Sequence, residues 1–156
     1  MKFCSLSFLL STVLMIFIPG CQTDTSPASK TAAAIHAGAP GPVVTTPSGL
    51  RYQVLASGPT GGKSPTINDS VTVHYKGTLT NGTVFDSSYD RGQPITLGVG
   101  QVIPGWTEAL QLMKPGDQWL IYVPSNFGYG AMATGSIPAN SDLIFQIHLL
   151  QVNGAP

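Results

Sequence analysis

One short stretch of this chain, residues 104–116, has the apolar spacing of an amphipathic helix. Trp106, Ala109, Leu110 and Met113 stand at i, i+3, i+4 and i+7, so a helix would stack them on one face. A Pro-Gly pair stands at each end of the stretch, where helices commonly start and stop. The sequence therefore predicts one short helix with a single buried face.

The residues around this stretch have the patterns of strands and turns. Residues 71–75 alternate between apolar and polar side chains, which is typical of a half-buried strand. Asn81-Gly82 predicts a two-residue hairpin turn, and residues 119–123 and 143–150 are apolar runs rich in β-branched and aromatic side chains. We expect an α+β fold in which antiparallel strands are covered on one face by the helix.

Composition limits the function classes that are open to the chain. Its 156 residues leave room for one ordinary domain, and seven basic residues balance seven acidic ones. Charged residues are only 9% of the total and the basic ones are scattered, so no electrostatic field favours nucleic acid. We therefore expect no nucleic-acid partner.

The first 20 residues predict an exported protein. Lys2 precedes an apolar run from Leu6 to Ile18, which is shorter than the about 20 residues that span a bilayer and fits a secretory signal peptide. The run ends at Cys21 in a segment similar to the lipobox of bacterial lipoproteins, which predicts lipidation, typically by palmitate, at Cys21. Gln22 favours the outer membrane, facing the periplasm. An uncleaved N-terminal anchor, or signal cleavage without a lipid, are the alternatives.

Residues 21–46 are predicted to be a flexible tether. Ala, Thr, Ser, Pro and Gly dominate this segment and no apolar periodicity runs through it, so ordering it would bury little apolar surface. A short helix at residues 31–36 is the alternative. The sequence thus predicts a signal peptide at 1–20, a tether at 21–46 and a folded domain at 47–156.

Six sequence blocks of the domain resemble those of FKBP-type peptidyl-prolyl cis-trans isomerases. Residues 104–110 are especially similar to the catalytic domain of bacterial macrophage infectivity potentiator-like members. The blocks are residues 73–77, 82–88, 101–106, 127–130, 137–138 and 143–145. The resemblance implies a twisted antiparallel sheet wrapped around the short helix.

The resemblance also implies an activity, the isomerisation of X-Pro bonds. Rotation about this bond crosses a barrier of roughly 18–20 kcal/mol because amide resonance is lost in the twisted state. No bond is broken, so neither a nucleophile nor a metal or other cofactor is expected. An apolar pocket that holds the proline ring, with a few donors for the rotated carbonyl, would lower this barrier.

The site residues carry over from the matching blocks. The resemblance implies that Trp106 is the pocket floor, that Tyr129 offers its hydroxyl to a substrate carbonyl, and that Asp86 stands at the pocket edge held by Tyr75 and Arg91. The implied catalytic set is Tyr75, Phe85, Asp86, Trp106 and Tyr129. The implied substrate-binding set is Arg91, Ile95, Val102, Ile103, Ile137 and Phe145. The apolar members could instead be ordinary core residues.

Expected partners are proline-containing polypeptides, with macrolide inhibitors as possible ligands and the membrane contacted through the lipid. The alternative function is a non-catalytic chaperone or peptide-binding module that uses the same groove. The chain has three histidines, His36, His74 and His148, and their spacing is not that of metal ligands. We therefore expect no metal site.

Overall fold

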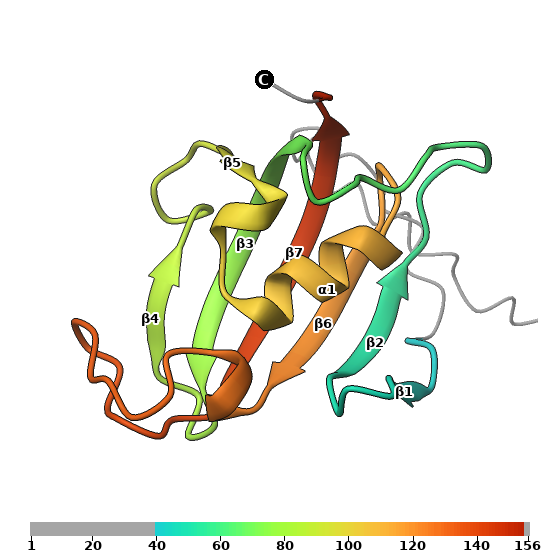
Figure 1. The fold of residues 1–156 in the computed structure, drawn as a ribbon. Coiled ribbons are helices and arrows are strands. Elements are labelled where there is room, and N and C mark those ends of the chain that lie inside the picture. Colours follow the sequence, from blue (N-terminus) through green and yellow to red (C-terminus); the bar gives the residue numbers. More distant parts are fainter. Residues whose placement is uncertain (1–39, 155–156) are drawn as a thin grey trace, which may run out of the picture. The chain divides into compact units, whose positions relative to one another are not determined.

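Seven antiparallel strands form one sheet in the computed structural model, which describes residues 40–154 (Figure 1). The described residues all belong to one compact unit. The elements are, in chain order, β1 (Val43–Thr45), β2 (Arg51–Ala56), β3 (Ser70–Leu79), β4 (Val84–Ser87), β5 (Ile95–Gly98), the 3₁₀ helix η1 (Val99–Gln101), α1 (Pro104–Leu112), β6 (Gln118–Val123), the 3₁₀ helix η2 (Ser125–Phe127) and β7 (Leu143–Val152). The predicted α+β class, an antiparallel sheet with a single α-helix in this part of the chain, is confirmed.

The two longest strands, β3 and β7, form the centre of the sheet. The strand order is β1-β2-β6-β7-β3-β4, and β5 pairs with β3 outside this path. On the edge of β3 away from β7, β5 pairs with residues 70–73 and β4 pairs with residues 76–78. Two separate strands thus lie one after the other along β3, and both contribute side chains to the site described below.

Helix α1 crosses one face of the sheet (Figure 1). Pro104 occupies its first position, where the fixed φ of proline and its missing N–H cost the helix nothing. The predicted apolar face is confirmed, because Trp106, Ala109, Leu110 and Met113 are all 0–5% exposed. Neither α1 nor any other helical segment of residues 40–154 has the length and hydrophobicity needed to cross a bilayer.

The folded domain begins before the predicted boundary at residue 47. Strand β1 pairs antiparallel with β2, and the Gly41 amide donates a 2.8 Å hydrogen bond to the Val54 carbonyl. All three side chains of β1 are exposed, so this strand is held by backbone hydrogen bonds and carries no apolar periodicity. The predicted signal peptide, Cys21 and the tether up to residue 39 lie outside the described residues.

The turn between β3 and β4 differs from the predicted two-residue hairpin. The Leu79 amide donates to the Thr83 carbonyl at 2.9 Å, which leaves three residues in the loop. Gly82 has a φ of 86°, while Asn81 is not in the positive-φ region and instead accepts a 2.9 Å hydrogen bond from the Thr83 amide. A single left-handed glycine suits a three-residue loop, whereas the predicted turn needs two residues at positive φ.

Candidate active site

A cavity of about 290 Å³ opens beside the N-terminal end of α1. Its walls come from β3, β4, β5, η1, α1, β7 and the loop after η2, so every layer of the fold contributes. The lining residues are Tyr75, Phe85, Asp86, Ile95, Leu97, Gln101, Val102, Ile103, Trp106, Tyr129 and Phe145. The fold thus collects residues separated by up to 70 positions into one site.

All five residues of the predicted catalytic set line this cavity, as do four of the six predicted substrate-binding residues. Ile137 does not line the cavity: its side chain is 5% exposed and belongs to the hydrophobic core, and its backbone pairs with that of Thr134 in an isolated bridge. Arg91 does not line the cavity either. Arg91 is connected to the cavity by its ion pair with Asp86 and its hydrogen bond to Tyr75, which both line it.

Two lining residues, Leu97 and Gln101, were absent from the predicted set. Leu97 stands two positions after Ile95 on β5, so strand alternation places both on the same face and could have identified it. Gln101 ends η1, and its side chain packs over Gly98, where a Cβ would lie 3.0 Å from the Gln101 Oε1. No sequence pattern predicts this local fold-back.

The floor of the cavity is a cluster of aromatic rings in edge-to-face contact. Trp106 is 5% exposed, and its ring centre lies 5.2 Å from that of Tyr75 and 5.2 Å from that of Phe145, with interplanar angles of 82° and 89°. Phe85 meets Phe145 at 5.5 Å and 87°. Edge-to-face pairs bring the positive edge of one ring to the negative face of the next. The cluster therefore forms an apolar surface at the floor of the cavity.

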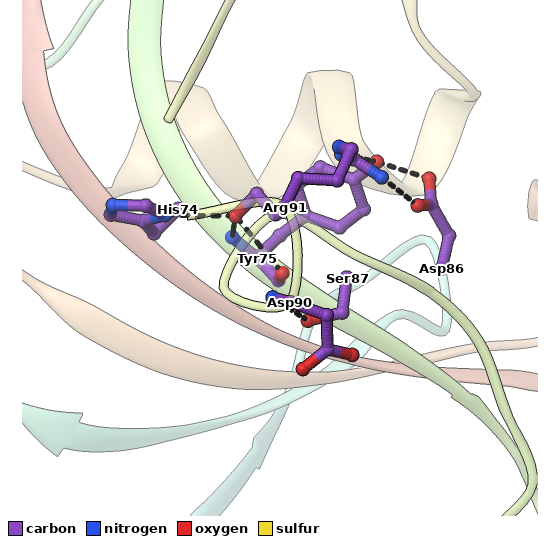
Figure 2. Close-up of polar contacts among 7 residues, drawn as sticks. His74, Tyr75, Asp86, Ser87, Asp90 and Arg91 are labelled. Atoms are coloured by element: carbon purple, nitrogen blue, oxygen red, sulfur yellow. Dashed lines mark hydrogen bonds and ion pairs between the residues drawn. The ribbon is translucent and has the colours of Figure 1, made fainter. Parts of the chain in front are cut away.

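One wall of the cavity carries a closed polar network (Figure 2). The Tyr75 hydroxyl donates to one oxygen of the Asp86 carboxylate, and Arg91 forms an ion pair with the other. Arg91 Nη2 also donates a 3.0 Å hydrogen bond to the Tyr75 hydroxyl oxygen, and its guanidinium carbon lies 5.6 Å from the Tyr75 ring centre. Each oxygen in this triad thus has a protein partner before any ligand arrives.

The network fixes the protonation states of its members. Burial raises the pKa of Tyr75, and its hydrogen bond to Asp86 raises it further, so the phenol stays protonated at neutral pH. Burial also raises the pKa of Asp86, but the hydrogen bonds from Tyr75 and Arg91 outweigh this, and the pKa of that carboxyl lies below its ordinary value. Asp86 is therefore an ionised and neutralised carboxylate, well suited to orient groups and poorly suited to accept a proton.

Tyr129 supplies the exposed rim of the cavity. Its side chain is 38% exposed, and it follows η2 in a turn that is closed by a 2.8 Å hydrogen bond from the Gly130 amide to the Ser125 carbonyl. Gly130 has a φ of 58°, a conformation that glycine adopts without strain. Within residues 40–154 the Tyr129 hydroxyl makes no hydrogen bond, so it is available to a ligand at the cavity mouth.

This fold and site agree with comparisons to known proteins. Residues 61–150 match the family model described as FKBP-type peptidyl-prolyl cis-trans isomerase. The chain therefore belongs to this family.

Individual relatives come from several bacteria. The chain is 55% identical over 111 residues to the peptidyl-prolyl cis-trans isomerase Mip of Coxiella burnetii. The aligned region covers 70% of this chain and 47% of that protein. It is 52% identical over 114 residues to the outer membrane protein MIP of Legionella longbeachae, covering 72% and 48%. The chain thus spans about half the length of the curated relatives it matches.

Solved structures show the same fold. The crystal structure of FkpA from Escherichia coli matches with a TM-score of 0.69 at 44% identity, over 73% of this chain and 53% of that one. The structure of AtFKBP13 matches with a TM-score of 0.65 at 31% identity, over 70% of this chain and 98% of that one. The predicted FKBP-like fold is confirmed.

Proposed function

We propose that this protein catalyses cis-trans isomerisation of X-Pro bonds in exported polypeptides. The observation that carries the proposal is the conjunction of an edge-to-face aromatic floor with an ionised, fully partnered carboxylate in one small cavity. Packing alone would not call for a charged triad beside Trp106. Family membership supports the same activity.

In the proposed mechanism the proline ring rests on Trp106, between Tyr75, Phe85 and Phe145. The planar amide is more polar than the twisted one, because resonance places negative charge on its oxygen. An apolar cavity therefore stabilises the twisted state relative to the planar state, and only this differential stabilisation accelerates the rotation. No bond to substrate is made or broken, so no residue has to act as nucleophile or base.

Polar groups add to this effect at the cavity edge. The free Tyr129 hydroxyl can donate to a substrate carbonyl and hold the chain on one side of the rotating bond. The Tyr75–Asp86–Arg91 triad presents a preorganised charge distribution to the carbonyl on the other side. Because its members already satisfy one another, the triad needs no rearrangement when substrate binds.

The decisive experiment is a protease-coupled isomerisation assay with short X-Pro peptides, run on the whole chain. We expect catalysis of the peptide reaction, together with faster refolding of a protein whose slow phase is limited by proline isomerisation. The alternative is a chaperone or peptide-binding module using the same groove. It would give peptide binding by the folded protein with isomerisation at the uncatalysed rate.

We also propose that the protein is a lipoprotein, held by acyl groups on Cys21 to the outer membrane and facing the periplasm. The apolar run that ends at the lipobox-like segment supports this. Two or more acyl chains would anchor the chain firmly, since each buried methylene contributes about 0.8 kcal/mol. The name of the Legionella longbeachae relative, an outer membrane protein, agrees with this placement.

Macrolide inhibitors are proposed ligands of the same cavity. The aromatic floor offers an apolar surface, whereas Ile95 and Leu97 form an aliphatic wall on the β5 side. An aliphatic wall gives a bound macrocycle less ring contact than an aromatic one. Micromolar inhibition in the peptide assay would support this part of the proposal.

A further inference from the structure

His74 and His148 face each other across the two central strands. They are register partners in the antiparallel pairing of β3 with β7. The neighbours of His74 along the chain, Val73 and Tyr75, are buried, as are both neighbours of His148, so the two histidines lie on the sheet face opposite the core. Side chains directly opposite each other on such strands have Cβ atoms roughly 4.5–5.5 Å apart.

The His74 ring is oriented by a fully buried serine. The Ser88 hydroxyl accepts a 2.8 Å hydrogen bond from the Tyr75 amide and donates its hydrogen to the Tyr75 carbonyl at 3.2 Å. His74 Nδ1 lies 2.9 Å from the same hydroxyl oxygen. In the tautomer that carries its hydrogen on Nδ1, His74 donates to this hydroxyl oxygen, and the lone pair of the ring is on Nε2.

A second contact holds the plane of the ring. Tyr89 stacks on His74 with ring centres 4.7 Å apart and an interplanar angle of 15°. In Figure 2 the remaining ring nitrogen of His74 lies on the far side of the ring from its dashed hydrogen bond. An imidazole whose Nδ1–H is bonded within the protein and whose Nε2 is free is the arrangement typical of metal-ligating histidines.

We propose that His74 and His148 together bind a divalent late first-row transition-metal ion, of which Zn²⁺ is the test case. Imidazole nitrogen is a preferred ligand of Zn²⁺, Ni²⁺ and Cu²⁺, and opposed imidazoles on neighbouring strands can approach one ion from two sides. This site lies on the sheet face opposite the cavity and does not depend on the proposed isomerase activity.

The surroundings set the coordination that is expected. Within residues 40–154 no group of three or more His, Cys, Asp and Glu side chains is placed to hold a metal. We therefore expect water to complete the shell around the two imidazoles. Lys76 lies two residues further along β3 on the same face, and its positive charge opposes a bound cation.

The test is calorimetric titration of the whole chain with zinc chloride at neutral pH. All samples carry His36→Ala, so that His74 and His148 are the two remaining histidines of the three in the chain. We expect one zinc ion per chain in this parent, and at least a tenfold loss of affinity in His74→Gln and in His148→Gln. Cys4 and Cys21 are unchanged in every sample, so any zinc that they bind is common to the parent and the variants and is subtracted when these are compared.

Lys76→Gln is the matched control on the same face and should bind zinc at least as tightly as the parent. Zinc should also raise the Tm of the parent, since it binds the folded state, and this shift should be absent in both histidine variants. Nitrogen-detected NMR of the parent needs no further substitution, and both imidazoles should shift over the same zinc range. Unchanged affinity in either glutamine variant, or a shift of only one imidazole, would overturn the proposal.

Discussion

Arg91 donates a 3.0 Å hydrogen bond to the hydroxyl oxygen of Tyr75, whose own hydrogen goes to Asp86. The Tyr75 hydroxyl therefore has a donor and an acceptor within the protein and is not the free hydroxyl of the cavity. That role is left to Tyr129 at the rim. The two tyrosines of the site are thus chemically distinct, one a fixed wall and the other an available donor.

Asp86→Leu and Tyr129→Phe should each reduce activity with little change in stability. Asp86→Leu keeps the approximate volume but removes the charge that orients Tyr75 and Arg91, and Tyr129→Phe removes one hydroxyl. The loss of the Tyr129 hydrogen bond to the twisted amide, or of the Asp86 charge that orients Tyr75 and Arg91, predicts a decrease of about one or two decades in kcat/KM. The free energy of unfolding should change by less than about 1–2 kcal/mol. Full activity of both variants on several X-Pro peptides would show that the apolar walls suffice.

Trp106→Ala should reduce stability and activity together. The indole is 5% exposed and contacts both Tyr75 and Phe145, so its removal opens a cavity in the core as well as in the pocket floor. We expect a loss of roughly 3–5 kcal/mol in the free energy of unfolding, measured by urea denaturation. Loss of activity with unchanged stability would mean that the ring serves substrate alone.

Gly77→Ala should displace the aromatic side chains that line the pocket. A Cβ at this position of β3 would lie 2.5 Å from Phe85 Cζ and 2.9 Å from Phe145 Cε1, closer than carbon atoms pack. Both rings line the cavity, so the added methyl must displace its aromatic wall. We expect a destabilisation of about 1–3 kcal/mol, typical of an overpacked core, with a reduced kcat/KM. Gly82→Ala is the contrasting variant, since it has nothing within 4 Å and its effect should be backbone strain from its φ of 86° without a change at the pocket.

Acid should weaken the fold partly through Asp86. Its pKa in the folded protein lies below its unfolded value, so its stabilising contribution is complete above about pH 4 and is lost as pH falls through the folded pKa. Asp86→Asn should therefore lower stability at pH 7 and make less difference at about pH 2–3. Urea denaturation of both proteins across this range measures the change. A constant difference at all pH values would show that the carboxylate charge contributes nothing.

Cys21→Ser should release the protein from membranes without unfolding its domain. The variant removes the proposed acylation site, which lies well before β1 in the sequence. Fractionation of cells after alkaline extraction should move the variant from the membrane to the soluble fraction, with the parent retained in the membrane. A variant that stays in the membrane would identify the N-terminal apolar run as the anchor.

Some features of the site can be predicted from the sequence, because they follow from the local spacing of apolar residues. The helix face of Trp106, Ala109 and Leu110 comes from a 3.6-residue period, and strand alternation places Tyr75 toward the core. Family blocks supplied the remaining pocket residues, and nine of the eleven predicted residues line the cavity. Ile137 does not line it, and a residue in a matching block can equally be a core residue, so its role in substrate binding stays a prediction.

The sequence by itself determined the buried face of the helix and the alternation of the strands, because both depend on near neighbours along the chain, and its sequence blocks indicated the family. The ends of the helix differ from the prediction, since α1 already includes Pro104 and ends at Leu112, ahead of Pro115. Only the tertiary structure decided the rest. Strand β1 is held by backbone bonds that leave no side-chain pattern, and Gln101 folds back over Gly98. The pairing of His74 with His148 depends on the register between two strands that lie 74 residues apart in the sequence. Register is set by the summed packing and hydrogen bonding of the whole sheet, so no local pattern could reveal it.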